Sequence, residues 1–154
     1  MKGKLGESEA LSIDSGVVLA YLLGEDLGEL VRDEILSEGR MVHFSRTAAS
    51  ELFYILCRRR GERFARETLE AVLRSGRVSV AASDDIDVEA GAYKCARSIS
   101  LADCYVLAVA KVMNATAVFA RREADMGKEA DRKPFDVDVL FLENMTGRKQ
   151  GKGG

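Results

Sequence analysis

Three acidic residues stand alone in segments that are otherwise uncharged and largely apolar. They are Asp14 within residues 10–24, Glu51 within residues 47–57 and Asp103 within residues 98–110. Burying an ionised carboxylate without a partner costs several kcal/mol or forces it to take up a proton. Three such groups brought together would also repel one another. Because a hard divalent cation with oxygen ligands removes both penalties, the pattern predicts that the three acids converge on a metal.

Each acid also has a structural explanation, and these alternatives stay open at this stage. Asp14 could cap a helix that begins at Ser15. The run Ser100-Leu101-Ala102-Asp103 matches the S-x-x-D capping box, and an acid in a first turn suits the helix dipole. Glu51 falls inside a predicted helix, so its alternative is an ion pair with an arginine of a neighbouring element. Capping leaves one carboxylate oxygen free, so it is compatible with metal binding.

Short apolar runs that alternate with helical patterns predict the elements that position these acids. Strands are expected at residues 10–13, 41–44, 77–81, 116–119 and 137–141. Helices are expected at residues 15–23, 27–36, 47–60, 62–73, 83–98 and 101–113. Strands separated by helices imply right-handed crossovers and a mostly parallel sheet covered on both faces. Ligands bind beyond the carboxyl ends of such strands, which is where Asp14 falls.

The composition limits the class of protein. Apolar residues make up 47% and charged residues 31% of the 154, a globular balance, and the net charge of −2 gives no general attraction for nucleic acid. Three cysteines without paired spacing argue against a disulfide framework. No apolar run approaches the roughly 18 residues of a membrane span, and the N-terminus lacks a signal core. We expect a cytoplasmic protein with a single domain over residues 1–146 and a flexible Gly/Lys-rich tail over residues 147–154.

Three segments carry the acids in order along the chain. They read LSIDSGVVLAYLLGE around Asp14, TAASELFYILCRR around Glu51, and SLADCYVLAVAKVMNATAVFA, in which Asp103 opens a helix. Together they resemble the PIN domain family, in particular the small archaeal and VapC-like ribonucleases, over roughly residues 8–142. The resemblance implies an α/β fold, a three-layer α/β/α sandwich with a five-stranded parallel sheet. It also implies cleavage of RNA that depends on Mg²⁺ or Mn²⁺ and, for a toxin of a toxin–antitoxin pair, an antitoxin partner and a homodimer.

The family usually supplies a fourth acid just after the strand equivalent to residues 116–119. Here the chain reads Phe119-Ala120-Arg121-Arg122-Glu123-Ala124-Asp125. Arg121 therefore stands about where many members of the family carry Asp. Glu123 is the first candidate for the fourth carboxylate and Asp125 the second, and the number of metals, one or two, stays open. The alternative is that both acids belong to a solvated polar loop that runs on through Asp131.

The predicted chemistry is hydrolysis of a phosphodiester bond, which needs an activated water, charge neutralisation at phosphorus and help for the leaving oxygen. Asp14 and Asp103 are predicted to bind the metal directly. Glu51 and Glu123 are predicted to bind a second metal or to position the attacking water. Ser15 matches the hydroxyl residue of the family and is predicted to orient Asp14 or a water on the metal. The alternative is that Ser15 is only the first polar residue of the helix.

Basic residues must bring RNA to this acidic site. Arg121 and Arg122 adjoin it and are predicted to bind phosphates. A second cluster surrounds a predicted helix end and consists of Arg58, Arg59, Arg60, Arg63 and Arg66. Its alternative is a solvated face that pairs with Glu62, Glu67 and Glu70. The only histidine, His43, lies in a predicted strand and is expected to be structural.

Two other classes of function stay open. One is a PIN-like module that has lost catalysis and serves as a protein- or RNA-binding module, a reading supported by Arg121. The other is a receiver-type phosphotransfer domain that uses Asp14. Against the second, no D-x-D follows the first strand and no acidic pair precedes it.

Overall fold

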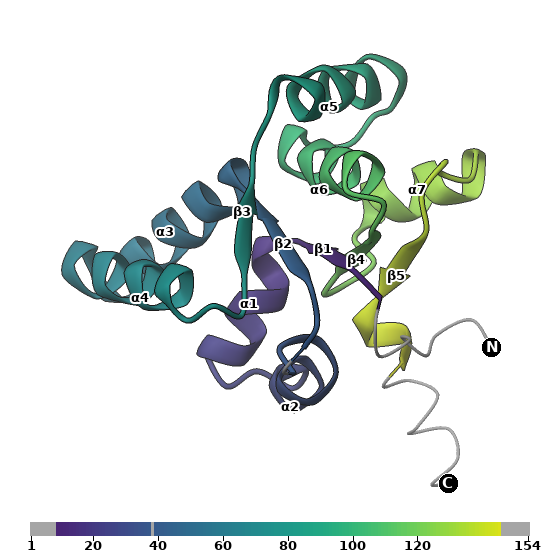
Figure 1. Cartoon of the computed structure of the whole chain (residues 1–154). Helices are drawn as coiled ribbons and strands as arrows, with labels where there is room; N and C mark the ends of the chain where they lie inside the picture. Colours follow the sequence, from purple (N-terminus) through teal and green to yellow (C-terminus); the bar gives the residue numbers. More distant parts are fainter. Residues whose placement is uncertain (1–8, 38, 146–154) are drawn as a thin grey trace, which may run out of the picture.

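A computed structural model of the chain describes residues 9–37 and 39–145, and within them five parallel strands form one sheet (Figure 1). The strands are β1 (Leu11–Ile13), β2 (Val42–Ser45), β3 (Ser79–Ala81), β4 (Thr116–Phe119) and β5 (Val139–Phe141). Their order across the sheet is β3-β2-β1-β4-β5. The predicted α/β fold with a five-stranded parallel sheet is confirmed. The predicted tail, residues 147–154, lies outside the described residues.

Helices cover both faces of the sheet (Figure 1). Successive side chains of a strand point to opposite faces, and in β1 all three are buried, so both faces must be covered. In β1, Leu11 and Ile13 belong to the core beneath α1 (Ser15–Leu22), α3 (Arg46–Arg60) and α4 (Glu62–Arg74). Ser12, between them, donates a 2.7 Å hydrogen bond to the carbonyl of Val106. Val106 belongs to the second core, beneath α5 (Asp84–Ala96), α6 (Leu101–Val112) and α7 (Ala124–Arg132). This arrangement is the predicted three-layer sandwich.

The single helix predicted over residues 27–36 is wrong in detail. The structure has one turn of α-helix, α2 (Gly28–Leu30), followed by a π-helix, η1 (Val31–Ile35). The amide of Leu36 bonds back to the carbonyl of Val31 at 2.9 Å, which closes the wider π turn. Gly28 lies so close to α1 that an added Cβ would meet the carbonyl oxygen of Ala20 at 2.9 Å. The absence of a side chain at Gly28 therefore allows the close contact with α1.

The solvated loop considered for residues 123–131 is also wrong, because residues 124–132 form α7. Its buried positions are Met126, Gly127 and Glu129. Only one of these three is a large apolar residue, so the segment lacks the apolar repeat by which a helix is recognised in a sequence. Burial of Glu129 on the inner face of α7 depends on its partners elsewhere in the chain, which the sequence of this segment does not indicate.

Three smaller expectations can be compared with the described residues. Cys57, Cys95 and Cys104 are all free thiols, as the absence of paired spacing predicts. His43 is buried in β2, and burial lowers the pKa of its imidazole, which fits a structural residue. Among the helices described, none is long and apolar enough to cross a membrane.

Candidate metal centre

The candidate site lies at the carboxyl end of β1, where the strand order of the sheet changes direction. From β1 the chain builds the sheet outward through β2 and β3, and on the other side through β4 and β5. Such a switch point leaves a crevice beyond the strand ends, and ligands of α/β proteins bind there. Asp14 is the first residue after β1, and its amide donates to the carbonyl of Val118 in β4 at 3.1 Å. The topology thus places Asp14 at the switch point of the sheet.

Asp14 is the N-cap residue of α1, so the capping explanation is confirmed. Its Oδ1 accepts a 3.0 Å hydrogen bond from the amide of Val17. Burial raises the pKa of Asp14 to about 7, and the neighbouring charges of Asp103 and Glu51 add to the rise. The amides of Val17 and Ala120 act in the opposite direction but do not offset it. A carboxylate in this state gains from any added cation.

Glu51 enters the site from α3 and is partly buried. The Ser15 hydroxyl donates a 2.6 Å hydrogen bond to Glu51 Oε1. An ion pair with an arginine, the alternative considered for this residue, is not formed within residues 9–37 and 39–145. The hydroxyl of Ser15 therefore bonds Glu51 and not Asp14, and it fixes one of the two oxygens of the glutamate.

Asp103 lies in the first turn of α6, where the Ser100 hydroxyl accepts a 3.1 Å hydrogen bond from the Asp103 amide. This is the serine half of the capping box expected from the sequence. Burial raises the pKa of Asp103 to about 6, and a hydrogen bond from Ser100 opposes the rise. The charges of Glu123, Glu51 and Asp125, in that order of effect, raise it further. The pKa of Asp103 is thus raised by the charges of three other acids of the candidate site.

Glu123 and Asp125 both lie at the start of α7 with exposed side chains. Glu123 is the N-cap residue, but its carboxylate makes no capping hydrogen bond. Of the two, Glu123 has the larger electrostatic effect on Asp103, which is consistent with its choice as the first candidate for the fourth acid. Its role, like that of Asp125, remains a prediction.

The five acids share one electrostatic environment without a basic partner. Within residues 9–37 and 39–145, none of them forms an ion pair with lysine or arginine. In this same part of the chain, no three His, Cys, Asp or Glu side chains are grouped closely enough to hold an ion directly. The donor set is entirely oxygen, and Mg²⁺ binds through one or two carboxylates while keeping several waters. The residues therefore fit a partly hydrated hard cation better than a closed protein cage.

The contact between Ser15 and Glu51 leads to a first testable expectation. Partners that orient a metal ligand typically contribute 10- to 100-fold to affinity or activity, so Ser15→Ala should weaken Mn²⁺ binding by about tenfold. Calorimetric titration with MnCl₂ measures this. Ser12→Ala is the matched control, since it removes a buried hydroxyl three residues earlier in the chain, in β1, that bonds a carbonyl of α6 instead. Equal affinities for both variants would show that the Ser15 hydroxyl does not position Glu51.

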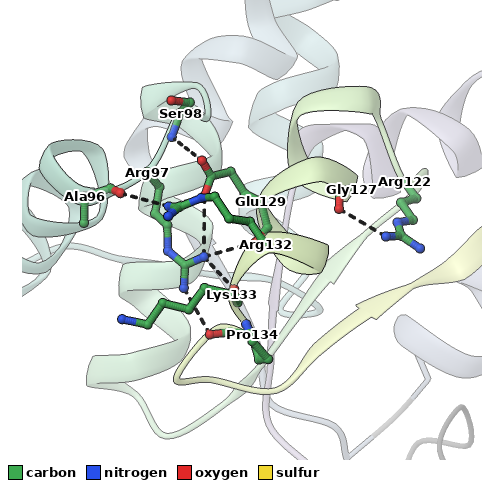
Figure 2. Close-up of polar contacts among 9 residues, drawn as sticks. All are labelled: Ala96, Arg97, Ser98, Arg122, Gly127, Glu129, Arg132, Lys133 and Pro134. Carbon is green, nitrogen blue, oxygen red and sulfur yellow. Dashed lines mark hydrogen bonds and ion pairs between the residues drawn. The ribbon is translucent and has the colours of Figure 1, made fainter.

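The two arginines predicted to bind phosphate have partners within the protein. Arg121 lies 3.8 Å from an Asp26 oxygen and 3.9 Å from a Glu143 oxygen, with 47% of its side chain exposed. Arg122 donates to the carbonyl of Gly127 at 3.1 Å (Figure 2). It also donates to Asp131 at 2.6 Å. Arg122 thereby ties the end of β4 to α7. Phosphate binding by Arg121 and Arg122 stays a prediction.

Glu143, just after β5, was missed by sequence reasoning. Its Oε1 accepts a 2.5 Å hydrogen bond from the amide of Arg122, and its other oxygen faces Arg121. The signal that could have found it is an acid directly after the last strand, at the same end of the sheet as Asp14. It helps to fix the segment between β4 and α7.

A second missed cluster holds α7 against the α5–α6 connection (Figure 2). Glu129 accepts hydrogen bonds from the Ser98 amide at 3.0 Å and from Arg132 at 2.8 Å. Arg97, with 8% of its side chain exposed, lies 3.6 Å from the carboxylate of Glu129. Its guanidinium also donates to the carbonyls of Glu129, Lys133 and Pro134 at 3.2, 2.6 and 3.1 Å. The cluster fixes the helix that carries Glu123 and Asp125.

Comparison with known proteins identifies the family to which this geometry belongs. The sequence model of the PIN domain family matches residues 11–125. The chain belongs to the PIN domain family. The match begins at β1 and ends at Asp125, so it includes the three solitary acids and the segment after β4. The predicted resemblance is confirmed.

Several solved structures share the fold at low sequence identity. Mycobacterium tuberculosis VapC20, described as a sarcin-ricin loop cleaving toxin, is 19% identical with a TM-score of 0.60, covering 77% of this chain and 93% of that chain. VapBC2 from Rickettsia felis, bound to a promoter DNA fragment, is 18% identical with a TM-score of 0.64, covering 86% and 98%. FitAcB from Neisseria gonorrhoeae is 19% identical with a TM-score of 0.57, covering 87% and 98%. None of the curated proteins compared with the chain matches its sequence significantly.

Proposed function

We propose that this PIN domain is an endoribonuclease that depends on Mg²⁺ or Mn²⁺ and hydrolyses RNA phosphodiester bonds at the acidic site. The observation that supports the proposal is that the charges of Asp103 and Glu51 act on Asp14, and that none of the three acids pairs with a basic residue in the part of the chain that the structure describes. Burial and mutual repulsion raise the pKa values of Asp14 to about 7 and of Asp103 to about 6. Keeping these acids near one another at the switch point of the sheet costs stability, and acids with perturbed pKa values of this kind are typical of functional sites.

In this proposal Asp14 and Asp103 bind the cation, and Glu51 and Glu123 bind a second cation or orient the attacking water. A bound divalent cation supplies charge neutralisation at the scissile phosphate and lowers the pKa of water. The chain supplies the orientation of its own ligands. The amide of Val17 fixes one oxygen of Asp14, and the hydroxyl of Ser15 fixes one oxygen of Glu51.

Arg121 is the basic residue best suited to meet the substrate phosphate in this account. Its two ion pairs, at 3.8 and 3.9 Å, are long, and nearly half of its side chain is exposed. Exposed pairs of this kind contribute about 0–1 kcal/mol, so a phosphate can displace them. Arg122 is engaged more closely with α7 and contributes mainly by holding that helix.

The decisive test is cleavage of an end-labelled single-stranded RNA by the purified chain. We expect cleavage in MnCl₂ and none in EDTA, with activity restored when MnCl₂ is added in excess of the chelator. Cleavage that persists in EDTA would contradict the metal-dependent mechanism. Absence of cleavage of a random-sequence RNA library in Mn²⁺ and in Mg²⁺ would contradict the assignment as a nuclease.

We further propose that the chain is the toxin of a toxin–antitoxin pair, acts in the cytoplasm and forms a homodimer. Support comes from the similar structures, among which VapC20 is a sarcin-ricin loop cleaving toxin and VapBC2 is bound to a DNA fragment from its promoter. A cavity of about 540 Å³ between α1, η1 and α4, lined in part by Leu22, Leu36 and Phe64, would suit an apolar segment of an antitoxin. A small DNA-binding protein encoded immediately upstream that inhibits cleavage is the expected partner. Sedimentation of the isolated chain tests the homodimer.

The alternative function is a PIN domain that has lost catalysis and binds RNA or protein. Arg121 favours it, because a basic residue occupies the place at which many relatives carry an acid and pairs there with Glu143. The two functions differ in Arg121→Asp. The nuclease account expects the wild type to cleave RNA in Mn²⁺ and the variant to cleave more slowly, because the variant loses the residue that meets the substrate phosphate, whereas a binding module cleaves RNA in neither form.

A further inference from the structure

One exposed face of α3 leads from the candidate metal site toward the arginine-rich end of the helix. Glu51, Tyr54 and Arg58 are spaced three and four residues apart, so their side chains lie along one face. At a rise of about 1.5 Å per residue, Arg58 lies roughly 10 Å along the helix from Glu51. Helical side chains lean toward the N-terminus, so the Tyr54 ring leans toward the turn that carries Glu51. The acids and this aromatic–basic pair therefore border one continuous surface.

Tyr54 is an exposed aromatic residue with a cationic neighbour. It is 43% exposed, although most large apolar side chains of α3 pack into the core. The guanidinium carbon of Arg58 lies 5.0 Å from the centre of the Tyr54 ring. An exposed aromatic ring beside an arginine is the combination by which proteins hold single-stranded nucleic acid, through base stacking and a contact to phosphate.

The charges of the arginine cluster divide between the two helices of the α3–α4 hairpin. On α4, Arg63 pairs with Glu67 at 3.1 Å and Arg66 with Glu62 at 2.8 Å, each one turn apart. The solvated-face explanation is therefore confirmed for these two. Arg58 forms no ion pair with any residue in the described ranges 9–37 and 39–145. A position near the C-terminus of α3 suits its charge, but it does not explain the exposed tyrosine beside it.

We propose that Tyr54 and Arg58 form a subsite for single-stranded RNA, in which a nucleobase stacks on the Tyr54 ring and Arg58 binds an adjacent phosphate. The proposal rests on RNA being the substrate of the acidic site, and it assigns the α3 face as the path of the strand next to that site. The positive charge of Arg58 is not paired with any acid in the described residues, so it is available to a phosphate. The protein as a whole has a net charge of −2. A local contact must then supply the affinity that the overall charge does not.

The test measures binding and not cleavage. An Asp14→Asn chain in EDTA is titrated into a fluorescently labelled single-stranded oligoribonucleotide, and anisotropy gives the affinity over a range of salt concentrations. Adding Tyr54→Ala should weaken binding by at least about fivefold, whereas adding Tyr54→Phe, which keeps the ring, should change it less than twofold. Adding Arg58→Gln should reduce the slope of log affinity against log salt by about 0.7.

Arg59→Gln is the matched control, because it removes the same charge from the next residue, which points about 100° away around the helix. We expect it to leave the salt slope unchanged. Equal losses for Arg58→Gln and Arg59→Gln would overturn the subsite in favour of a diffuse electrostatic effect. Unchanged RNA affinity in the Tyr54 and Arg58 variants, with altered sedimentation, would overturn it in favour of an interface between copies of the chain.

The same measurements separate this inference from the nuclease proposal. Tight RNA binding that depends on Tyr54 and Arg58, in a chain that does not cleave RNA in Mn²⁺, would support the subsite and contradict the nuclease. Cleavage by the wild type together with unchanged RNA affinity in both variants would support the nuclease and contradict the subsite. Thermal unfolding of each variant confirms that the fold is retained.

Discussion

Asp14→Asn should reduce Mn²⁺-dependent RNA cleavage by at least about a hundredfold while leaving the metal-free protein as stable as the wild type or more so. The activity falls because the substitution removes a proposed ligand of the cation that would neutralise charge at phosphorus and activate water, and losing electrostatic stabilisation of the transition state costs on the order of 10²-fold in rate. No other carboxylate in the described residues follows β1 at the switch point. The loss should therefore appear in the rate at saturating RNA, with little change in RNA affinity.

The stability of the metal-free variant should be retained because asparagine keeps what the fold needs from this position. Asparagine is as good an N-cap as aspartate, so the hydrogen bond from the Val17 amide can be kept. The substitution also removes a carboxyl group whose pKa is raised to about 7, mainly by burial and further by the charges of Asp103 and Glu51. Relief of that repulsion should raise the melting temperature in EDTA above neutral pH by about 2–4 °C.

Differential scanning calorimetry in EDTA, with and without added MnCl₂, measures both parts of this expectation. In the wild type MnCl₂ should raise the melting temperature, because a ligand that binds only the folded state stabilises it. In Asp14→Asn the shift should disappear. A variant that melts well below the wild type in EDTA would show that the Asp14 charge is a structural requirement, contrary to this account.

Arg97→Met should destabilise the protein by about 3 kcal/mol, although Arg97 lies outside the acidic site. The substitution keeps an unbranched apolar stem but removes the guanidinium from a pair in which both side chains are 8% exposed. Breaking a buried pair by removing one partner is strongly destabilising, because the remaining groups lose their compensation. Here the carbonyls of Lys133 and Pro134 also lose their donors, and Phe135 loses a cation 4.4 Å from its ring.

The control for Arg97→Met is Arg63→Met on α4. Arg63 forms an equally clear pair, with Glu67 at 3.1 Å, but its side chain is 93% exposed. Exposed pairs contribute about 0–1 kcal/mol, so urea unfolding should give a change within about 0.5 kcal/mol. Similar losses in the two variants would contradict the view that burial of the Arg97–Glu129 cluster holds α7 in place.

The sequence predicts the site better than it predicts the segment that completes the site. Asp14, Glu51 and Asp103 are recognisable because each interrupts an apolar segment, and charge in the wrong surroundings is visible without a structure. The same contrast does not exist around Glu129, which lies among charged residues and is buried by partners 31 residues away at Ser98. The sequence therefore does not distinguish the helix α7 from a solvated polar loop.

The apolar runs predict the strands with small errors at their ends, but no pattern in the sequence predicts the π-helix η1. Its wider turn depends on the bond between Leu36 and Val31, which no residue type specifies. The two explanations of the arginine cluster could be separated only when the pairs of Arg63 and Arg66 were placed in space. Spacing allows such pairs along a helix, but it does not decide which arginines form them.

The most direct test of the central claim is calorimetric titration of MnCl₂ into the wild type and into a chain carrying Asp14→Asn and Asp103→Asn together. The wild type should bind Mn²⁺ saturably, and the double variant should lose at least about tenfold in affinity. Asp85→Asn, which removes an exposed acid from α5, should bind as the wild type does. Mn²⁺ binding of equal strength in the wild type and the double variant, or no binding by the wild type, would contradict the claim that these carboxylates hold a metal.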